Sequence, residues 1–151
     1  MVVLANKVNY YKWGGIDVAF AWRPDLSVGF DEIDNQHKEL FARVNMLLEA
    51  TSQGKGKEAV GTTISYLGQY VASHFGTEER HMARSQYPEV SSHKAQHVQF
   101  TNEFSTIKKK FEAEGPTSQL TILIQRQVCD WLINHIGKTD KALGAFLRAK
   151  A

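Results

Sequence analysis

Two pairs of potential metal ligands lie in the middle of the chain, each with a spacing of four residues. His74 and Glu78 form the first pair, and His93 and His97 form the second. On a helix, side chains four residues apart lie on the same face about one turn apart. The length of chain between the pairs suits two antiparallel helices that turn these side chains toward each other. Imidazole and carboxylate groups together are ligands that borderline transition metals prefer, so the sequence predicts a metal site.

The composition is that of an ordinary globular protein of 151 residues, with 42% hydrophobic and 23% charged residues. A formal net charge of +2 is too small to indicate nucleic acid or an anionic membrane as a partner. The only cysteine is Cys129, which excludes an intrachain disulfide, and we expect it to be a small buried apolar group. No apolar run reaches the ~20 residues that span a bilayer, and the N-terminus lacks the apolar stretch of a secretory signal. We therefore expect a cytoplasmic protein without membrane insertion.

Hydrophobic periodicity predicts four helices. Asp34 is the expected N-cap of the first helix, and Thr117 or Ser118 can cap the fourth. Glycine- or proline-containing breaks separate the segments. Helices of this length joined by short loops predict an all-α fold, an antiparallel up-down-up-down four-helix bundle. Apolar residues recur at helical spacing over residues 34–51, 58–84, 91–113 and from about 118 to 135.

The residues before the first helix show no helical period. We expect a single domain over residues 1–151, in which residues 1–17 form an N-terminal extension without site chemistry. Residues 18–33 are predicted to be an extended arm, and residues 34–148 the helical bundle. The arm should pack aromatic side chains along the outside of the bundle. The aromatic residues of this region are Tyr10, Tyr11, Trp13, Phe20, Trp22 and Phe30.

The end of the fourth helix carries two further potential ligands, His135 and Asp140. Residues five apart on a straight helix point about 140° away from each other, at about 100° per residue. If both side chains face the core, the helix must break between them, and Gly137 is a residue that permits such a break. A short final helix over about Lys141 to Arg148 would follow.

The potential ligands that face the predicted core are five imidazoles and two carboxylates. Each histidine alone could be an ordinary surface or core residue, but burying five without partners would cost several kcal/mol. Seven ligands are too many for one ion and suit two ions, with the carboxylates bridging and the histidines in terminal positions. A bridging oxo or hydroxo group would complete the coordination and leave room for an exogenous ligand. The seven are His37, His74, Glu78, His93, His97, His135 and Asp140.

Over about residues 18–148 the sequence resembles the hemerythrin family, in particular the bacterial hemerythrins. All seven ligand positions of the family pattern are filled, in the family's order and spacing. The matching pieces are Val28-Gly29-Phe30, Ile33-Asp34-Asn35-Gln36-His37-Lys38-Glu39-Leu40-Phe41, His74-Phe75 with Glu78-Glu79 and Met82, His93-x-x-x-His97, and Trp131-Leu132-x-x-His135-Ile136 with Asp140.

The resemblance implies a non-haem diiron centre (Fe²⁺/Fe³⁺) with a bridging oxo or hydroxo group, which binds dioxygen reversibly. One iron would be held by His93, His97 and His135 and the other by His37 and His74, with Glu78 and Asp140 bridging. The iron with two histidines would keep the open position for dioxygen. The resemblance also places a dry pocket around this iron, although the same side chains could equally be ordinary core. The pocket residues are Leu40, Phe75, Trp131, Leu132 and Ile136.

The function that this resemblance implies is oxygen carriage, storage or delivery to an oxygen-consuming enzyme, by a protein that is not itself an enzyme. One alternative is an oxygen or redox sensor, for which the N-terminal arm is the candidate transmitter. Another is a diiron enzyme that reduces peroxide or nitric oxide, and a peroxidase side activity is compatible with the main interpretation. The sequence leaves the oligomeric state open.

A ferritin-like diiron carboxylate site is a further alternative, because such sites use a Glu-x-x-His motif on each of two helices. Only Glu78-x-x-His81 fits this motif here. We expect His81 to be structural or partly exposed, with a role beside the site or in proton transfer as the alternative. Glu79 is predicted to lie on the surface.

Overall fold

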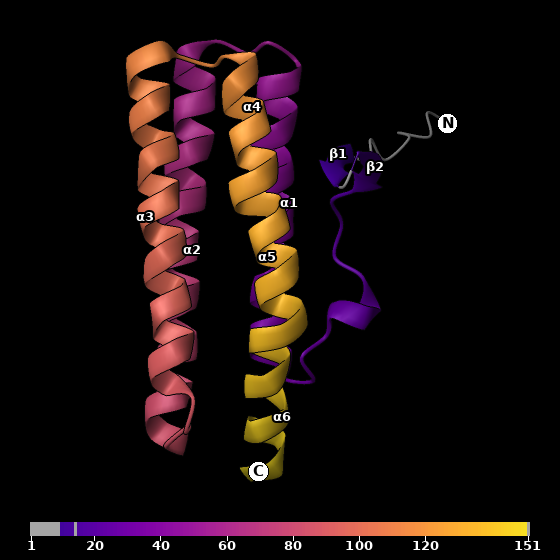
Figure 1. Ribbon diagram of the computed structural model, residues 1–151, viewed down its shortest axis with the longest axis vertical. Coiled ribbons are helices and arrows are strands. Elements are labelled where there is room, and N and C mark those ends of the chain that lie inside the picture. The colour runs from indigo at the N-terminus through magenta and orange to yellow at the C-terminus, as the bar shows by residue number, and fades with distance from the viewer. Residues whose placement is uncertain (1–9, 14, 151) are drawn as a thin grey trace, which may run out of the picture.

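The protein is a bundle of four long helical segments, seen in a computed structural model that describes residues 10–13 and 15–150 (Figure 1). Successive segments run antiparallel, and the first packs against both the second and the fourth. The predicted all-α, up-down-up-down bundle is thus confirmed. The segments are α1 (Asp31–Ser52), α2 (Lys57–Ser85), α3 (Val90–Glu114) and a fourth composed of α4 (Ser118–Ile124), η2 (Gln125–Asp130), α5 (Trp131–Asn134), η3 (His135–Asp140) and α6 (Lys141–Lys150).

The fourth segment is helical from end to end, and two of its turns are π-helical. One of them, η3, begins at His135 and ends at Asp140. A π-helical turn bonds residue i to residue i+5, so residues five apart come to lie on the same face. The predicted break at Gly137 is therefore wrong, since the wider turn achieves the same placement without ending the helix. The predicted final helix is present as α6.

The start of α1 also differs from the prediction. The N-cap is Phe30, and Asp34 lies within the first turn rather than capping it. Its carboxylate accepts hydrogen bonds from the backbone N–H of Val28, at 2.8 Å, and from the Ser27 hydroxyl. Asp34 thus links the preceding segment to the helix by hydrogen bonds instead of capping the helix N-terminus. The predicted cap of the fourth segment is confirmed, because the Thr117 hydroxyl accepts a hydrogen bond from the Leu120 N–H.

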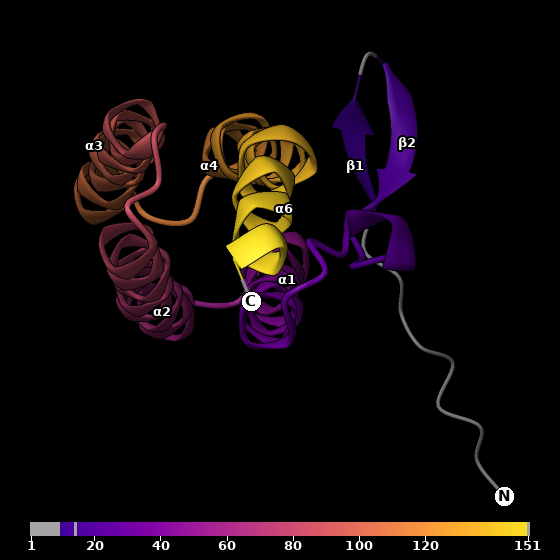
Figure 2. The same cartoon turned by 90° about the horizontal axis from the view of Figure 1, so that it is seen from below.

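A β-hairpin precedes the bundle, where an extended chain was expected. Strands β1 (Tyr10–Trp13) and β2 (Ile16–Ala19) pair antiparallel, with Tyr10 opposite Ala19. Gly15 at the turn has φ of 83°, in the region that favours glycine. The hairpin stands beside the bundle, with β1 against η2 (Figure 2). Residues 1–9 of the expected extension lie outside the described residues.

A connecting segment of residues 20–30, which contains the 3₁₀ turn η1 (Pro24–Leu26), joins the hairpin to α1. Phe20 stacks on Phe41 of α1, with ring centroids 4.4 Å apart, and the Lys38 ammonium lies over the Trp22 ring. The expected aromatic packing is present here, whereas Tyr10 is exposed and the side chains of Tyr11 and Trp13 lie outside the described part of the chain.

The buried apolar side chains form two clusters. The large apolar cluster includes Leu40 of α1 and Ile136 of η3 and fills most of the bundle. The small apolar cluster lies toward the other end and consists of Val28, Ile33, Met82, Tyr87, Leu143 and Leu147. Along the chain, buried polar side chains separate the two clusters. Among the described residues, no helix is long and apolar enough to cross a membrane.

Candidate metal centre

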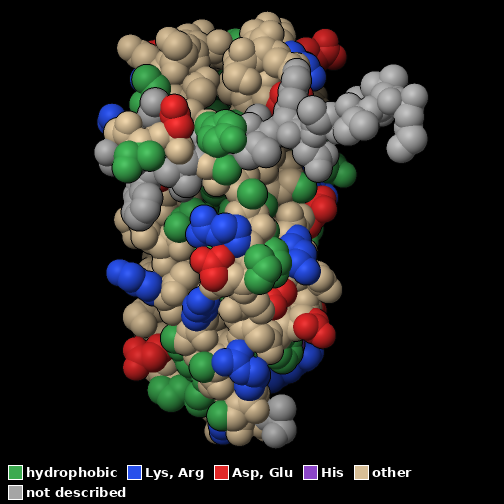
Figure 3. All heavy atoms as spheres, turned by 90° about the vertical axis from the view of Figure 1, so that its right-hand side faces the viewer, with side chains coloured by type: hydrophobic (Ala, Val, Ile, Leu, Met, Phe, Trp, Pro, Cys, Tyr) green, Lys and Arg blue, Asp and Glu red, His purple; other side chains and the backbone are tan. Residues whose placement is uncertain are grey.

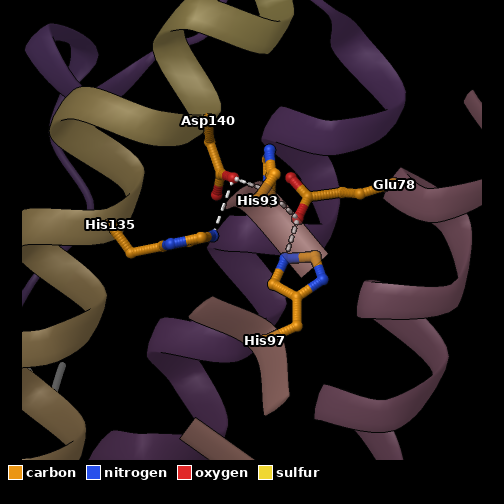
Figure 4. Close-up of side chains that lie close together, drawn as sticks. All are labelled: Glu78, His93, His97, His135 and Asp140. Carbon is orange, nitrogen blue, oxygen red and sulfur yellow. Dashed lines mark hydrogen bonds and ion pairs between the residues drawn. The ribbon is translucent and has the colours of Figure 1, made fainter. Parts of the chain in front are cut away.

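All seven predicted ligands converge between the two apolar clusters. Together they form a polar cluster, which is called the cluster below. None of them is more than 4% exposed. α1 contributes one, and α2, α3 and η3 contribute two each. Figure 4 shows five of these side chains turned toward one another from three helical segments. On the face of the molecule in Figure 3, acidic and basic side chains are interspersed, and no histidine is visible among the side chains drawn in colour.

Asp140 lies among three imidazoles that come from three different helical segments. Its Oδ1 is 3.1 Å from Nε2 of His93 and 3.0 Å from Nε2 of His135. Its Oδ2 is 3.0 Å from Nε2 of His37. The two oxygens of this carboxylate thus face different histidines, as a bridging ligand requires.

Glu78 occupies a corresponding position on the other side of the cluster. Its Oε1 lies 3.1 Å from Nε2 of His97 and 3.6 Å from Nε2 of both His74 and His93. Its Oε2 is 4.0 Å from Nε2 of His37. Glu78 therefore also contacts histidines from more than one helix.

These contacts divide the ligands into two overlapping groups. In each group, the potential ligand atoms lie within 4.8 Å of one another. Glu78 and Asp140 belong to both groups, which is the arrangement needed for two ions that share two carboxylates. The first group adds His93, His97 and His135, and the second adds His37 and His74.

Several buried polar atoms in the cluster have no hydrogen-bond partner. They include Nε2 of His37, His93 and His135 and both carboxylate oxygens of Asp140. Although these nitrogens lie near Asp140, the contacts lack hydrogen-bond geometry. Each buried atom left unpaired costs about 1–3 kcal/mol. Cations placed among these atoms would satisfy them together, so the residues fit a pair of metal ions.

The outer ring nitrogens of two histidines are bound to glutamine side chains. Nδ1–H of His74 donates to Oε1 of Gln36 and Nδ1–H of His135 donates to Oε1 of Gln96, both at 2.7 Å. A proton held on Nδ1 leaves the lone pair on Nε2, which faces the cluster. Each glutamine is hydrogen-bonded in turn to a threonine hydroxyl: Gln36 to Thr77 and Gln96 to Thr139.

Burial and neighbouring charges shift the pKa values of the ligands in different directions. Burial opposes protonation of His93, but Asp140 and Glu78 raise its pKa to about 9. Desolvation and the neighbouring imidazoles lower the pKa of His74 to about 3 and that of His97 to about 2. Both are therefore neutral near pH 7, as ligation requires. Burial and the nearby Asp140 raise the pKa of Glu78 well above its ordinary value. Burial opposes ionisation of Asp140, but His135 and the other imidazoles hold its pKa well below the ordinary range.

Apolar side chains pack against one side of the cluster. Phe75 stacks on His97, with ring centroids 3.8 Å apart and an angle of 6° between the rings. Trp131 stacks on His135 at 4.3 Å and packs against the large apolar cluster. The other expected pocket residues belong to the large apolar cluster and are fully or almost fully buried: Leu40, Leu132 and Ile136.

Three residues for which the sequence predicted a role other than metal ligation can also be located. His81 lies outside it, with Nε2 2.9 Å from Oε2 of Glu32, and is partly exposed as expected. Cys129 is buried, and burial raises the pKa of its thiol. The prediction that Glu79 is a surface residue is incomplete, because its Oε1 lies 3.6 Å from Nδ1 of His97. Helical spacing gives no signal for this contact, because Glu79 points about 100° away from the core-facing Glu78.

The sequence and the fold of this chain are similar to those of known proteins from one family. The family model "Hemerythrin HHE cation binding domain" matches residues 28–147. The chain is 39% identical over 124 residues to bacteriohemerythrin of Methylococcus capsulatus, covering 82% of this chain and 90% of that protein. It is 27% identical to myohemerythrin of Theromyzon tessulatum, covering 80% and 88%. A solved structure of wild-type hemerythrin aligns with a TM-score of 0.75 at 32% identity, covering 84% of this chain and 96% of that one.

The assignment of ligands can be tested by exchanging one histidine inside the cluster and one outside it. We expect His37→Ala to lower the metal content of the reconstituted, dialysed protein by about one ion per chain, because one ion loses one of its two histidines. His81→Ala should leave the metal content unchanged. Metal analysis by mass spectrometry measures both. Loss of metal in His81→Ala with full metal content in His37→Ala would favour a ferritin-like site instead.

Proposed function

The chain belongs to the hemerythrin family, and we propose on this basis that it binds dioxygen reversibly at a pair of iron ions, for carriage, storage or delivery of oxygen. The observation that carries the proposal is the pair of ligand groups that share Glu78 and Asp140. Two carboxylates common to two sets of imidazoles suit two adjacent ions better than one.

The proposed ligands are unequally divided between the two ions. His93, His97 and His135 would hold one, and His37 and His74 the other. The ion with fewer histidines would therefore retain a position for an exogenous ligand. When bound, the iron pair with its oxo or hydroxo bridge would supply this open position and the electrons for reversible dioxygen binding.

The protein's own contribution is to orient the histidines, to exclude water from them and, at His74 and His97, to keep the imidazole neutral. Gln36 and Gln96 fix the Nδ1 protons of His74 and His135, so that the ligating nitrogens face inward. Leu40, Leu132, Ile136, Phe75 and Trp131 form the proposed wall of the oxygen pocket. Their apolar surfaces admit an apolar gas and exclude water, which would otherwise promote irreversible oxidation.

Reversible binding rather than catalysis is supported by the ligand set. Oxygen-activating sites of the ferritin type take a Glu-x-x-His motif from each of two helices. Here the His81 of the one such motif pairs with Glu32 outside the cluster. We therefore propose that the protein is not primarily an enzyme.

An oxygen or redox sensor is the second candidate, because the connecting segment contacts the region next to the site. Val28 of this segment belongs to the small apolar cluster together with Leu143 of α6, and Arg148 of α6 donates a hydrogen bond to the carbonyl of Val28. A change at Asp140 could reach this segment through α6, which follows η3 directly.

An optical titration tests the main proposal. The iron-loaded protein is reduced without air, exposed to oxygen and then returned to an oxygen-free atmosphere. We expect a ligand-to-iron charge-transfer band that appears with oxygen and disappears when oxygen is removed. Immediate and permanent conversion to the fully oxidised form would instead favour a redox sensor or an enzyme.

The dry pocket can be tested with a truncation in α1. Leu40 lies one turn from His37 and is fully buried. Leu40→Ala should raise the rate of autoxidation several-fold, because the shortened side chain admits water. Leu47→Ala, at a buried position two turns further along the same helix, is the matched control for lost core packing. Equal autoxidation rates in the two variants would contradict the proposed pocket.

A further inference from the structure

The two ring nitrogens of His97 have different surroundings. Nε2 faces the cluster, 3.1 Å from Oε1 of Glu78. Nδ1 points away from the cluster, toward the helix that carries Glu78 (Figure 4). This nitrogen is buried and has no hydrogen-bond partner, whereas Nδ1 of His74 and of His135 are each bound to a glutamine. His97 therefore lacks the neutral amide partner that these two histidines have.

The nearest carboxylate to this nitrogen is that of Glu79, with Oε1 at 3.6 Å. The contact is within ion-pair range and slightly too long for a hydrogen bond. Glu79 follows Glu78 in α2, and consecutive helical residues point about 100° apart. The two adjacent carboxylates thus contact opposite nitrogens of one imidazole, Glu78 on the side of the cluster and Glu79 on the outer side.

A surface pocket of about 260 Å³ between α2 and α3 gives the Glu79 side chain room to move. Glu79, His97 and Phe75 line it, together with Val98, which is 58% exposed. Phe75 stacks on the face of the His97 ring and fixes its plane. A bond from Nδ1 to Glu79 would fix the remaining freedom, rotation of the ring within that plane.

We propose that Glu79 is a positioning residue, which accepts a hydrogen bond from Nδ1–H of His97 and holds its Nε2 toward the metal site. Glu79 would be a negatively charged partner, in contrast to the neutral glutamines beside His74 and His135. A carboxylate partner makes an imidazole a more basic ligand. His97 would then stabilise the oxidised state of its ion more strongly than an amide-bound histidine does. The inference rests on the proposed metal site.

Two substitutions separate the hydrogen bond from the charge. Glu79→Gln keeps an acceptor and removes the charge, whereas Glu79→Ala removes both. The first measurement is the affinity of the metal-free protein for Co²⁺, by competition with a chelator. We expect Glu79→Ala to weaken Co²⁺ binding roughly tenfold and Glu79→Gln to weaken it less. The second is the midpoint potential of the iron-loaded protein, which should rise in both variants because the oxidised state loses a stabilising charge.

Glu32→Gln is the matched control. It makes the same change of charge beside His81, a histidine outside the cluster, and should leave Co²⁺ affinity and midpoint potential at the wild-type values. Wild-type affinity and potential in both Glu79 variants would overturn the inference, even if their melting temperatures fell, because that result describes a merely structural residue. If the wild-type protein itself bound neither Co²⁺ nor iron, the proposed metal site would fail, and the inference with it.

Discussion

The structure depends on placing seven proposed metal ligands in the interior of a helical bundle. Five imidazoles and two carboxylates are almost completely buried, and several of their atoms lack hydrogen-bond partners. Such a cluster destabilises a fold unless bound cations compensate for the lost hydration. It also occupies the level between the two apolar clusters, so both must close around it. The bundle is therefore best understood as a support for a buried charged centre.

Much of this arrangement follows from local sequence patterns. The spacing of His74 to Glu78 and of His93 to His97 places each pair on one helical face, and the apolar periodicity places those faces toward the core. The placement of Asp140 does not follow, because a spacing of five residues from His135 conflicts with an ordinary α-helix. The chain resolves the conflict with a π-helical turn, whose extra residue per turn leaves no signature in the sequence. Glycine at position 137 suggested a break instead, and this prediction was wrong.

Other differences between the prediction and the structure arise from contacts between segments that are far apart in the sequence or that lie outside the helices. Asp34 has the type and position of an N-cap, but its carboxylate accepts hydrogen bonds from the Val28 backbone N–H and the Ser27 hydroxyl. Gly144 of α6 lies so close to the Val28 backbone that a Cβ atom there would clash. The connecting segment is therefore held against α1 and α6, at the end of the bundle where the small apolar cluster covers the site. The contact of Glu79 with His97 likewise depends on the packing of α2 against α3, which periodicity alone does not specify.

We propose that Glu78 and Asp140 are shared by two metal ions. The most direct test is a crystal structure of the iron-loaded protein, with anomalous diffraction measured on both sides of the iron absorption edge. We expect two iron peaks per chain, one beside His93, His97 and His135 and the other beside His37 and His74, with both carboxylates between them. A single peak, or iron bound away from these side chains, would contradict it.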